Sequence, residues 1–395
     1  MEKPQKIKSD RFRRLATAAA FAGLFSYAAT LFVTPASNNE IAQTYDASLG
    51  MLARLALAVM VGFLSAVLLA GWYSDKRGKL PTILAGCISM MIGLIIFGSA
   101  SSFNLLIVAS FLMGLGGGLS ESTCMALIAD LYHESRRTAM ANLSQAAFGV
   151  GAVISPLAIG WLLKLGISFR IGYFGTALVC AISAAIAFSA LSMRCETTRV
   201  ESHINTKWKE LIGDSLVLML AFGIMLYVGA EIGQSQWLAV YFQQGLNAKR
   251  ELAAWSLSFM WLGILTGRIA GALASKIVSE IALIRLCLIL SALSQSALLL
   301  TGSPVFGLVF VFLFGFFLGP VFPTIVSCAS GAYPLRSGTV TSIVVAAGAL
   351  GAAIFPPAIG WAADFVGLKT ALWTCMAILS IDAGMFAAMR SVCRR

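Results

Sequence analysis

The chain has 395 residues, of which 59% are hydrophobic and only 11% carry a charge. Soluble domains carry about 25% charged residues, so this composition excludes an ordinary soluble fold. The formal net charge is +11, but the basic residues lie between apolar blocks with no RNA-binding signature, which argues against nucleic acid as a partner.

Long apolar blocks recur from one end of the chain to the other. A helix needs roughly 20 apolar residues to cross about 30 Å of hydrocarbon. The first block follows a basic segment and continues from Phe21 to Val33 without a cleavage-like site, so we interpret it as an uncleaved helix. Twelve spans are predicted: 15–38, 51–72, 81–100, 103–131, 138–163, 170–193, 213–243, 250–274, 280–301, 304–333, 338–363 and 368–390.

A polar stretch that begins at Arg194 divides the chain into two parts. It separates a six-helix half over residues 1–193 and a linker over 194–212 from a second six-helix half over 213–395. Most of the 28 Lys and Arg residues fall in segments that share a side with both termini. The positive-inside rule therefore predicts a multi-pass protein of the plasma membrane, or of the cytoplasmic membrane if bacterial, with both termini in the cytoplasm.

A repeat relates the two halves. Residues 151–162 read GAVISPLAIGWL and residues 351–362 read GAAIFPPAIGWA, so that Pro156 matches Pro356 at an offset of 200. Six spans, an even number, separate the copies, so the halves share one orientation. Since proline removes a helix hydrogen bond, we expect these helices to bend and Pro320 and Pro323 to break the tenth span.

The loop after the second span resembles the signature loop of the major facilitator superfamily. Residues 71–79 read GWYSDKRGK, against the family pattern G-x-x-x-D-[RK]-x-G-[RK]-[RK], and the sequence departs only at Leu80. The resemblance implies an all-α membrane protein of twelve transmembrane helices in two parallel, pseudo-symmetric six-helix halves. We assign gating to this loop and to charged residues near the same membrane surface: Gly71, Asp75, Arg77, Gly78, Asp130, Arg136 and Arg268.

The seventh span resembles the fucose–proton symporter and sodium-dependent glucose transporter branch, in which Y-x-G-x-E and W-[LI]-x-x-Y recur. Here the segments read YVGAE from Tyr227 and WLAVY from Trp237. Polar residues at i, i+3 and i+4 form one helix face, which can bind sugar hydroxyls or, alternatively, pair with another helix. With polar residues of the first and fifth spans, the predicted substrate-binding set is Asn38, Asn39, Asn142, Gln145, Tyr227, Glu231, Gln234, Ser235, Trp237 and Tyr241.

Glu121 lies in the middle of the fourth span, after a glycine-rich stripe. A charge at the bilayer centre costs about 2.5 to 3.5 kcal/mol, so such a residue calls for a function or a partner. The resemblance implies coupling by an acidic residue of the fourth helix, and we assign proton coupling to Glu121 and Glu231. The alternative for Glu121 is a structural glutamate that is hydrogen-bonded to a neighbouring helix.

The sequence contains no G-x-x-x-x-G-K-[ST] nucleotide loop and no clustered catalytic groups, so we expect neither an enzyme nor a bound cofactor or metal. We predict a monomeric secondary active transporter in the lipid bilayer. It would move a small polar solute, with a sugar as the leading candidate, by alternating access with proton coupling. A proton-driven multidrug or metabolite exporter is the alternative, because a similar glycine–proline motif in the fifth helix marks drug–proton antiporters.

Overall fold

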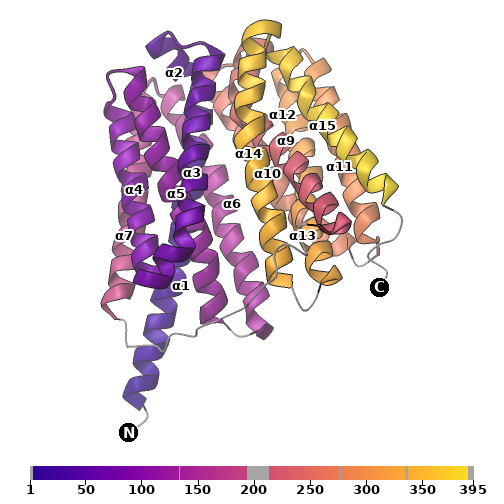
Figure 1. Cartoon of the computed structure of the whole chain (residues 1–395). Coiled ribbons are helices and arrows are strands. Elements are labelled where there is room, and N and C mark those ends of the chain that lie inside the picture. Colours follow the sequence, from indigo (N-terminus) through magenta and orange to yellow (C-terminus); the bar gives the residue numbers. More distant parts are fainter. Residues whose placement is uncertain (1–2, 133, 194–212, 276, 334–336, 390–395) are drawn as a thin grey trace. The chain divides into compact units, whose positions relative to one another are not determined.

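The computed structural model describes residues 3–132, 134–193, 213–275, 277–333 and 337–389. Every regular element in these ranges is a helix, and twelve stretches are long and apolar enough to span a membrane, which confirms the predicted all-α fold (Figure 1). The helices are α1 (Lys3–Ala36), α2 (Asn38–Tyr45), α3 (Leu49–Arg77), α4 (Lys79–Ser99), α5 (Phe103–Leu131), α6 (Glu134–Lys164), α7 (Arg170–Ser192), α9 (Ser215–Gly245), α10 (Arg250–Ala274), α11 (Glu280–Leu300), α12 (Pro304–Leu318), α13 (Val321–Ala332), α14 (Ser337–Val366) and α15 (Leu368–Ala388).

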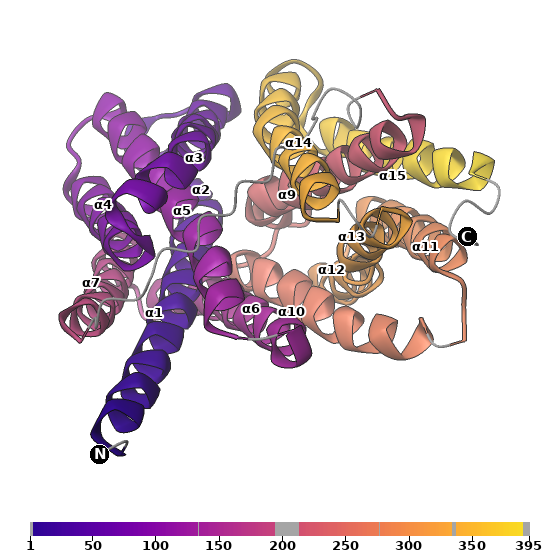
Figure 2. The ribbon, with the colours of Figure 1, turned by 60° about the horizontal axis from the view of Figure 1, so that its bottom comes forward.

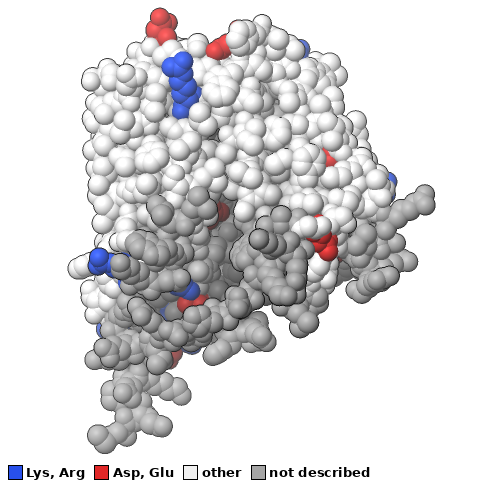
Figure 3. Space-filling view, in the orientation of Figure 1, with Lys and Arg blue, Asp and Glu red and all other residues white. Residues whose placement is uncertain are grey.

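Large apolar side chains are exposed along the outer faces of the helices, as expected where helices face lipid. Leu178 of α7 is 63% exposed and Leu293 of α11 is 60% exposed. On the face drawn in Figure 3, the described Lys, Arg, Asp and Glu residues gather mainly toward the two ends of the helices, and the band between them carries few charged atoms. This distribution fits a protein whose middle lies in hydrocarbon.

The chain forms two compact units. The first comprises residues 1–40 and 54–201, and the second comprises 41–53 and 202–395. In the first unit, α1 packs against α5, α6 and α7, and α4 packs against α5 and α7. In the second unit, α9 packs against α14 and α15, and α11 packs against α12 and α15 (Figure 2).

The segment 41–53 joins the second unit at the end of α14. Asp364 Oδ2 accepts hydrogen bonds from the Gly50 backbone N–H at 2.7 Å and from Ser48 Oγ at 3.3 Å. The carboxylate thus satisfies an N–H group at the start of α3, a position where negative charge is favourable.

Glycines permit the same helix contacts in both units. A Cβ atom on Gly151 of α6 would lie 2.5 Å from the Phe25 oxygen of α1, and one on Gly351 of α14 would lie 2.0 Å from the Met225 oxygen of α9. Gly351 lies 200 residues after Gly151, and Met225 lies 200 residues after Phe25, so the sequence repeat is also a packing repeat. Three further glycine contacts recur at an offset of 201: Gly62 and Gly263, Gly114 and Gly315, and Gly118 and Gly319.

Proline has different effects in different helices. In the tenth span, α12 ends at Leu318 and α13 begins at Val321, which confirms the predicted break at Pro320. Pro323 does not break the helix, because it lies in the first turn of α13, where a proline leaves no helix hydrogen bond unmade. Pro156 of α6 and Pro356 of α14 lie inside helices that continue through them. The short helix α2 is a feature that the sequence did not predict, and the first span ends at Ala36 rather than at residue 38.

Asp214 caps the start of α9. Its Oδ1 accepts hydrogen bonds from the backbone N–H groups of Leu216 at 2.9 Å and Val217 at 3.3 Å. The Tyr333 hydroxyl, just beyond α13, donates a further bond, and these bonds lower the pKa of Asp214. The cap therefore ties the beginning of α9 to the end of α13.

Gly351→Ala should lower the melting temperature of the purified protein, because the new methyl group would overlap the Met225 oxygen. Overpacking of this kind costs about 1 to 3 kcal/mol. Gly175→Ala in α7 is the matched control, since nothing lies within 4 Å of its Cβ position. Thermal unfolding followed by fluorescence should show a loss for the first variant and no loss for the second; equal melting temperatures would contradict the packing repeat.

Candidate functional site

A polar cluster lies inside the second unit, between α9 and α10. Tyr227 and Glu231 stand one turn apart on α9 and are 0% and 5% exposed. Arg268 of α10 interacts electrostatically with both. We call Tyr227, Glu231 and Arg268 the α9–α10 cluster. A buried phenol, a buried carboxylate and a partly exposed guanidinium group thus lie within electrostatic range of one another.

Three atoms of the α9–α10 cluster have no hydrogen-bond partner of normal geometry among the described residues. They are Tyr227 Oη, Glu231 Oε1 and Arg268 Nε, although the Tyr227 hydroxyl lies close enough to the carboxylate to interact with it. An unpaired buried polar atom costs about 1 to 3 kcal/mol, so water or a polar ligand is expected to complete the set. Together the atoms offer a hydroxyl, an acceptor and a donor.

One turn along α9 from Glu231, Gln234 pairs with Gln295 of α11. Gln295 Nε2 donates to Gln234 Oε1 at 2.8 Å and to the Leu372 oxygen of α15 at 3.3 Å, and both glutamines are 0% exposed. A backbone carbonyl can only accept, so Leu372 orients the Gln295 amino group and Gln234 must accept through Oε1. Gln234 Nε2 is left as a donor whose partner is not among the described residues.

The other predicted ligands on α9 use their polar atoms within the second unit. Ser235 Oγ donates to the backbone oxygen one turn before it at 2.9 Å. Trp237 Nε1 donates to the Pro356 oxygen of α14 at 2.8 Å, and Tyr241 Oη donates to the Leu298 oxygen of α11 at 3.3 Å. Trp237 and Tyr241 therefore tie α9 to α14 and α11 in this conformation, whereas the Ser235 bond stays within α9.

In the first unit, Glu121 of α5 interacts electrostatically with Tyr27 of α1. Glu121 is partly exposed, whereas Tyr27 is only 6% exposed. Gly117, one turn before Glu121, leaves room for the tyrosine ring, because a Cβ atom there would lie 2.4 Å from Tyr27 Cε2. Tyr27 and Tyr227 are related by the offset of 200, so each unit sets a tyrosine of its first helix against a glutamate.

The structure places the remaining predicted ligands elsewhere in the first unit. Asn38 and Asn39 are buried at the start of α2. Gln145 of α6 donates through Nε2 to Met125 Sδ of α5 at 3.3 Å. The side chain of Asn142 lies outside the described residues.

Two of the predicted gating residues, Arg77 and Gly78, lie where α3 meets α4, and Asp130 lies near the end of α5. Lys79, the last residue of the signature loop, forms an ion pair with Asp130 of α5 and donates to the Ala126 oxygen at 3.0 Å. Gly78 adopts a φ angle of 95°, a conformation that favours glycine, and Arg77 is exposed. The side chains of Asp75 and Arg136, together with Gly71, lie outside the described residues.

The whole-chain comparison decides the family. The sequence profile of the Major Facilitator Superfamily matches residues 19–356. The chain belongs to this superfamily. The match confirms the membership expected from the loop at residues 71–79, and the chain is therefore a multi-pass membrane transporter for a small molecule. Proteins of this superfamily are generally not enzymes.

Similar proteins include sequence relatives and solved structures. The glucose/mannose transporter GlcP of Bacillus subtilis (strain 168) is 27% identical over 338 residues, which cover 81% of each chain. A TsgA homolog of Yersinia pestis (strain Pestoides F) is 22% identical over 384 residues, covering 93% of this chain and 95% of the relative. A bacterial homolog of the human lysosomal transporter Spinster, in an inward-facing and occupied conformation, shares the fold with a TM-score of 0.77 at 14% identity, covering 95% of this chain and 96% of that chain.

Two residues of the site, Tyr27 beside Glu121 and Gln295 beside Gln234, were not predicted from the sequence. Tyr27 could have been found by extending the offset of 200 back to the first span, where Gly23 and Tyr27 match Gly223 and Tyr227. Gln295 lies between two serines of its span, and its neighbours in the chain do not indicate that it faces Gln234.

Exchanging each amide for a carboxylate tests the orientation of the glutamine pair without any substrate. Gln234→Glu keeps the acceptor that Gln295 needs, whereas Gln295→Glu removes the donor and sets a carboxylate against the Leu372 oxygen. We expect Gln295→Glu to lower the melting temperature more, since an unsatisfied buried group costs about 1 to 3 kcal/mol. Equal losses, or a larger loss in Gln234→Glu, would contradict the assigned orientation.

Proposed function

We propose that this superfamily member is a proton-coupled symporter for a hydroxylated, sugar-like solute, which it moves by alternating access. The observation that carries this proposal is the α9–α10 cluster, in which three buried polar atoms have no partner of normal geometry among the described residues. The similarity to a glucose/mannose transporter over 81% of the chain supports the same class of solute. A monomer with both termini in the cytoplasm completes the proposal.

The α9–α10 cluster suits a solute that both donates and accepts hydrogen bonds. Glu231 accepts from a solute hydroxyl, Arg268 donates to a solute oxygen, and Tyr227 can do either. Hydrogen bonds to charged groups are roughly twice as strong as neutral ones, so this cluster supplies much of the binding energy. Without solute, Glu231 and Arg268 still offset each other's charge, which lets both remain in the interior.

Gln234 extends this set by one turn. Its free Nε2 atom is a donor, and its orientation is set by Gln295 and Leu372. A solute oxygen next to this amide would complete its hydrogen bonding. We therefore retain Tyr227, Glu231 and Gln234 of the predicted set, and we move Arg268 from the gate to the binding site.

Coupling is assigned to Glu121. An ionised carboxylate at the bilayer centre costs about 2.5 to 3.5 kcal/mol, whereas a protonated one carries no such charge penalty. Proton uptake at Glu121 would therefore make enclosure of this part of the first unit less costly, and it would change the electrostatic interaction of Glu121 with Tyr27. The ion pair between Lys79 and Asp130, at the end of the same helix, serves as part of the gate.

The test is uptake of labelled glucose into proteoliposomes under an imposed pH gradient. The wild-type protein should accumulate glucose. Glu121→Gln should lose gradient-driven accumulation but keep exchange of labelled for unlabelled glucose, because the neutral amide imitates the protonated acid. Glu231→Gln should lose at least about tenfold in kcat/KM for both processes, since it removes a charged hydrogen-bond acceptor.

Asp10→Asn is the control for loss of a carboxylate, because within the described residues Asp10 pairs with Arg13 in an exposed ion pair. It should leave uptake unchanged. Absence of glucose accumulation in the wild type, together with proton-driven efflux of a cationic dye, would overturn the proposal in favour of an exporter. Unchanged accumulation in Glu121→Gln would remove that residue from coupling.

A further inference from the structure

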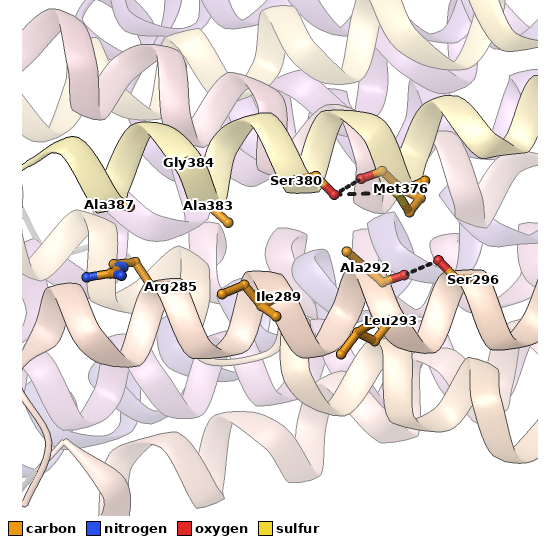
Figure 4. A pocket seen from close by; sticks show the side chains of 10 residues that line it. All are labelled: Arg285, Ile289, Ala292, Leu293, Ser296, Met376, Ser380, Ala383, Gly384 and Ala387. Atoms are coloured by element: carbon orange, nitrogen blue, oxygen red, sulfur yellow. Dashed lines mark hydrogen bonds between the residues drawn. The ribbon is translucent and has the colours of Figure 1, made fainter.

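A groove of about 330 Å³ runs between α11 and α15 of the second unit (Figure 4). Ile289 and Leu293 line it from α11 and are 46% and 60% exposed, so it opens on the lipid-facing side of these helices. Ala383, Gly384 and Ala387 line it from α15, and their small side chains leave the space between the helices unfilled. A volume near 300 Å³ is at the lower end of the range for ligand sites.

Apart from Arg285, the side chains that line the groove offer no free hydrogen-bond donor. Ser296 Oγ donates to the Ala292 oxygen at 2.9 Å, and Ser380 Oγ donates to the Met376 oxygen at 2.9 Å. Both hydroxyls are thus satisfied within their own helices. A ligand that lies along the groove must therefore be apolar over this length.

Arg285 stands at one end of the groove. It is exposed, and no ion pair of Arg285 occurs in the described part of the chain. Arg285 lies only about 8 Å along α11 from the start of that helix at Glu280. Ala387, which lines the same end of the groove, is the penultimate residue of α15. This end of the groove is therefore near the membrane surface, where a long arginine side chain reaches the lipid headgroups.

The length of the groove matches one leaflet. From Arg285 to Ser296 it extends about 16 Å along α11, which is about half of the roughly 30 Å hydrocarbon core. An acyl chain attached to a headgroup at Arg285 would follow the groove for its whole length.

We propose that this groove binds an anionic phospholipid, with one acyl chain between α11 and α15 and the phosphate on Arg285. On entering the groove the acyl chain moves from one apolar environment to another, so the groove fits the chain but does little to distinguish one lipid from another. Selectivity must come from the guanidinium group, which binds a phosphate through two parallel hydrogen bonds. A zwitterionic lipid carries the same phosphate, but its ammonium group repels Arg285. The proposal is independent of the transported solute.

The test is native mass spectrometry of the purified full chain after incubation with an equimolar mixture of phosphatidylglycerol and phosphatidylethanolamine. The wild type should retain phosphatidylglycerol about fivefold over phosphatidylethanolamine, which is what one basic residue near a membrane surface contributes. Arg285→Gln should reduce this ratio to about one. Lys369→Gln removes an exposed charge at the opposite end of α15 and should leave the ratio unchanged.

Gly384→Leu tests the groove itself, because the new side chain would fill it. This variant should retain less of both lipids. An unchanged lipid ratio in Arg285→Gln would overturn the proposal, and so would wild-type protein that retains neither lipid. If Gly384→Leu fails to fold, Arg285→Glu decides the question, since it keeps the groove and should favour phosphatidylethanolamine; continued preference for phosphatidylglycerol would refute the assignment.

Discussion

Burial of charge inside a lipid-spanning bundle is the constraint on which the arrangement of this protein depends. Each ionisable group at membrane depth needs a facing polar group, because lipid supplies none. In the second unit Glu231 faces Arg268 and Tyr227, and in the first unit Glu121 faces Tyr27. These pairings explain why polar residues can persist in helices that are otherwise apolar. Asp382 of α15 is an exception to this pattern: it is fully buried with both oxygens unpaired among the described residues, and the proposed function gives it no role.

Close backbone contact gives each unit its internal rigidity. Without a hydrophobic driving force between helices in lipid, small residues at the interface allow the van der Waals packing that holds helices together. The contacts of Gly151 with α1 and of Gly351 with α9 show that both units use the same solution at equivalent positions. A transporter that alternates between two states benefits from such rigid halves, because movement can then occur between packed bodies without loosening the polar pairs inside them.

The apolar blocks predicted the spans, because lipid demands long apolar helices whatever their neighbours are. The loop at residues 71–79 indicated the family, and Pro320 indicated the break in the tenth span. Gating at Asp130 is still a prediction, and its ion pair with Lys79 supports it.

The orientation of side chains on α9 could not be predicted, since it depends on which helix packs on each face. Trp237 illustrates this limit: it was predicted to bind the substrate, but its N–H donates to the Pro356 oxygen. The partnership of Gln295 with Gln234 likewise joins residues 61 positions apart.

Equilibrium binding of labelled glucose to the purified protein tests most directly whether the α9–α10 cluster holds the solute. The account predicts saturable binding by the wild type that Arg268→Gln weakens by at least about tenfold, because a charged hydrogen bond contributes about 1.5 to 3 kcal/mol. Tyr227→Phe should weaken it less, and Trp237→Phe should leave it nearly unchanged if the variant keeps the wild-type melting temperature. Wild-type affinity in Arg268→Gln would contradict the central claim and place the solute elsewhere.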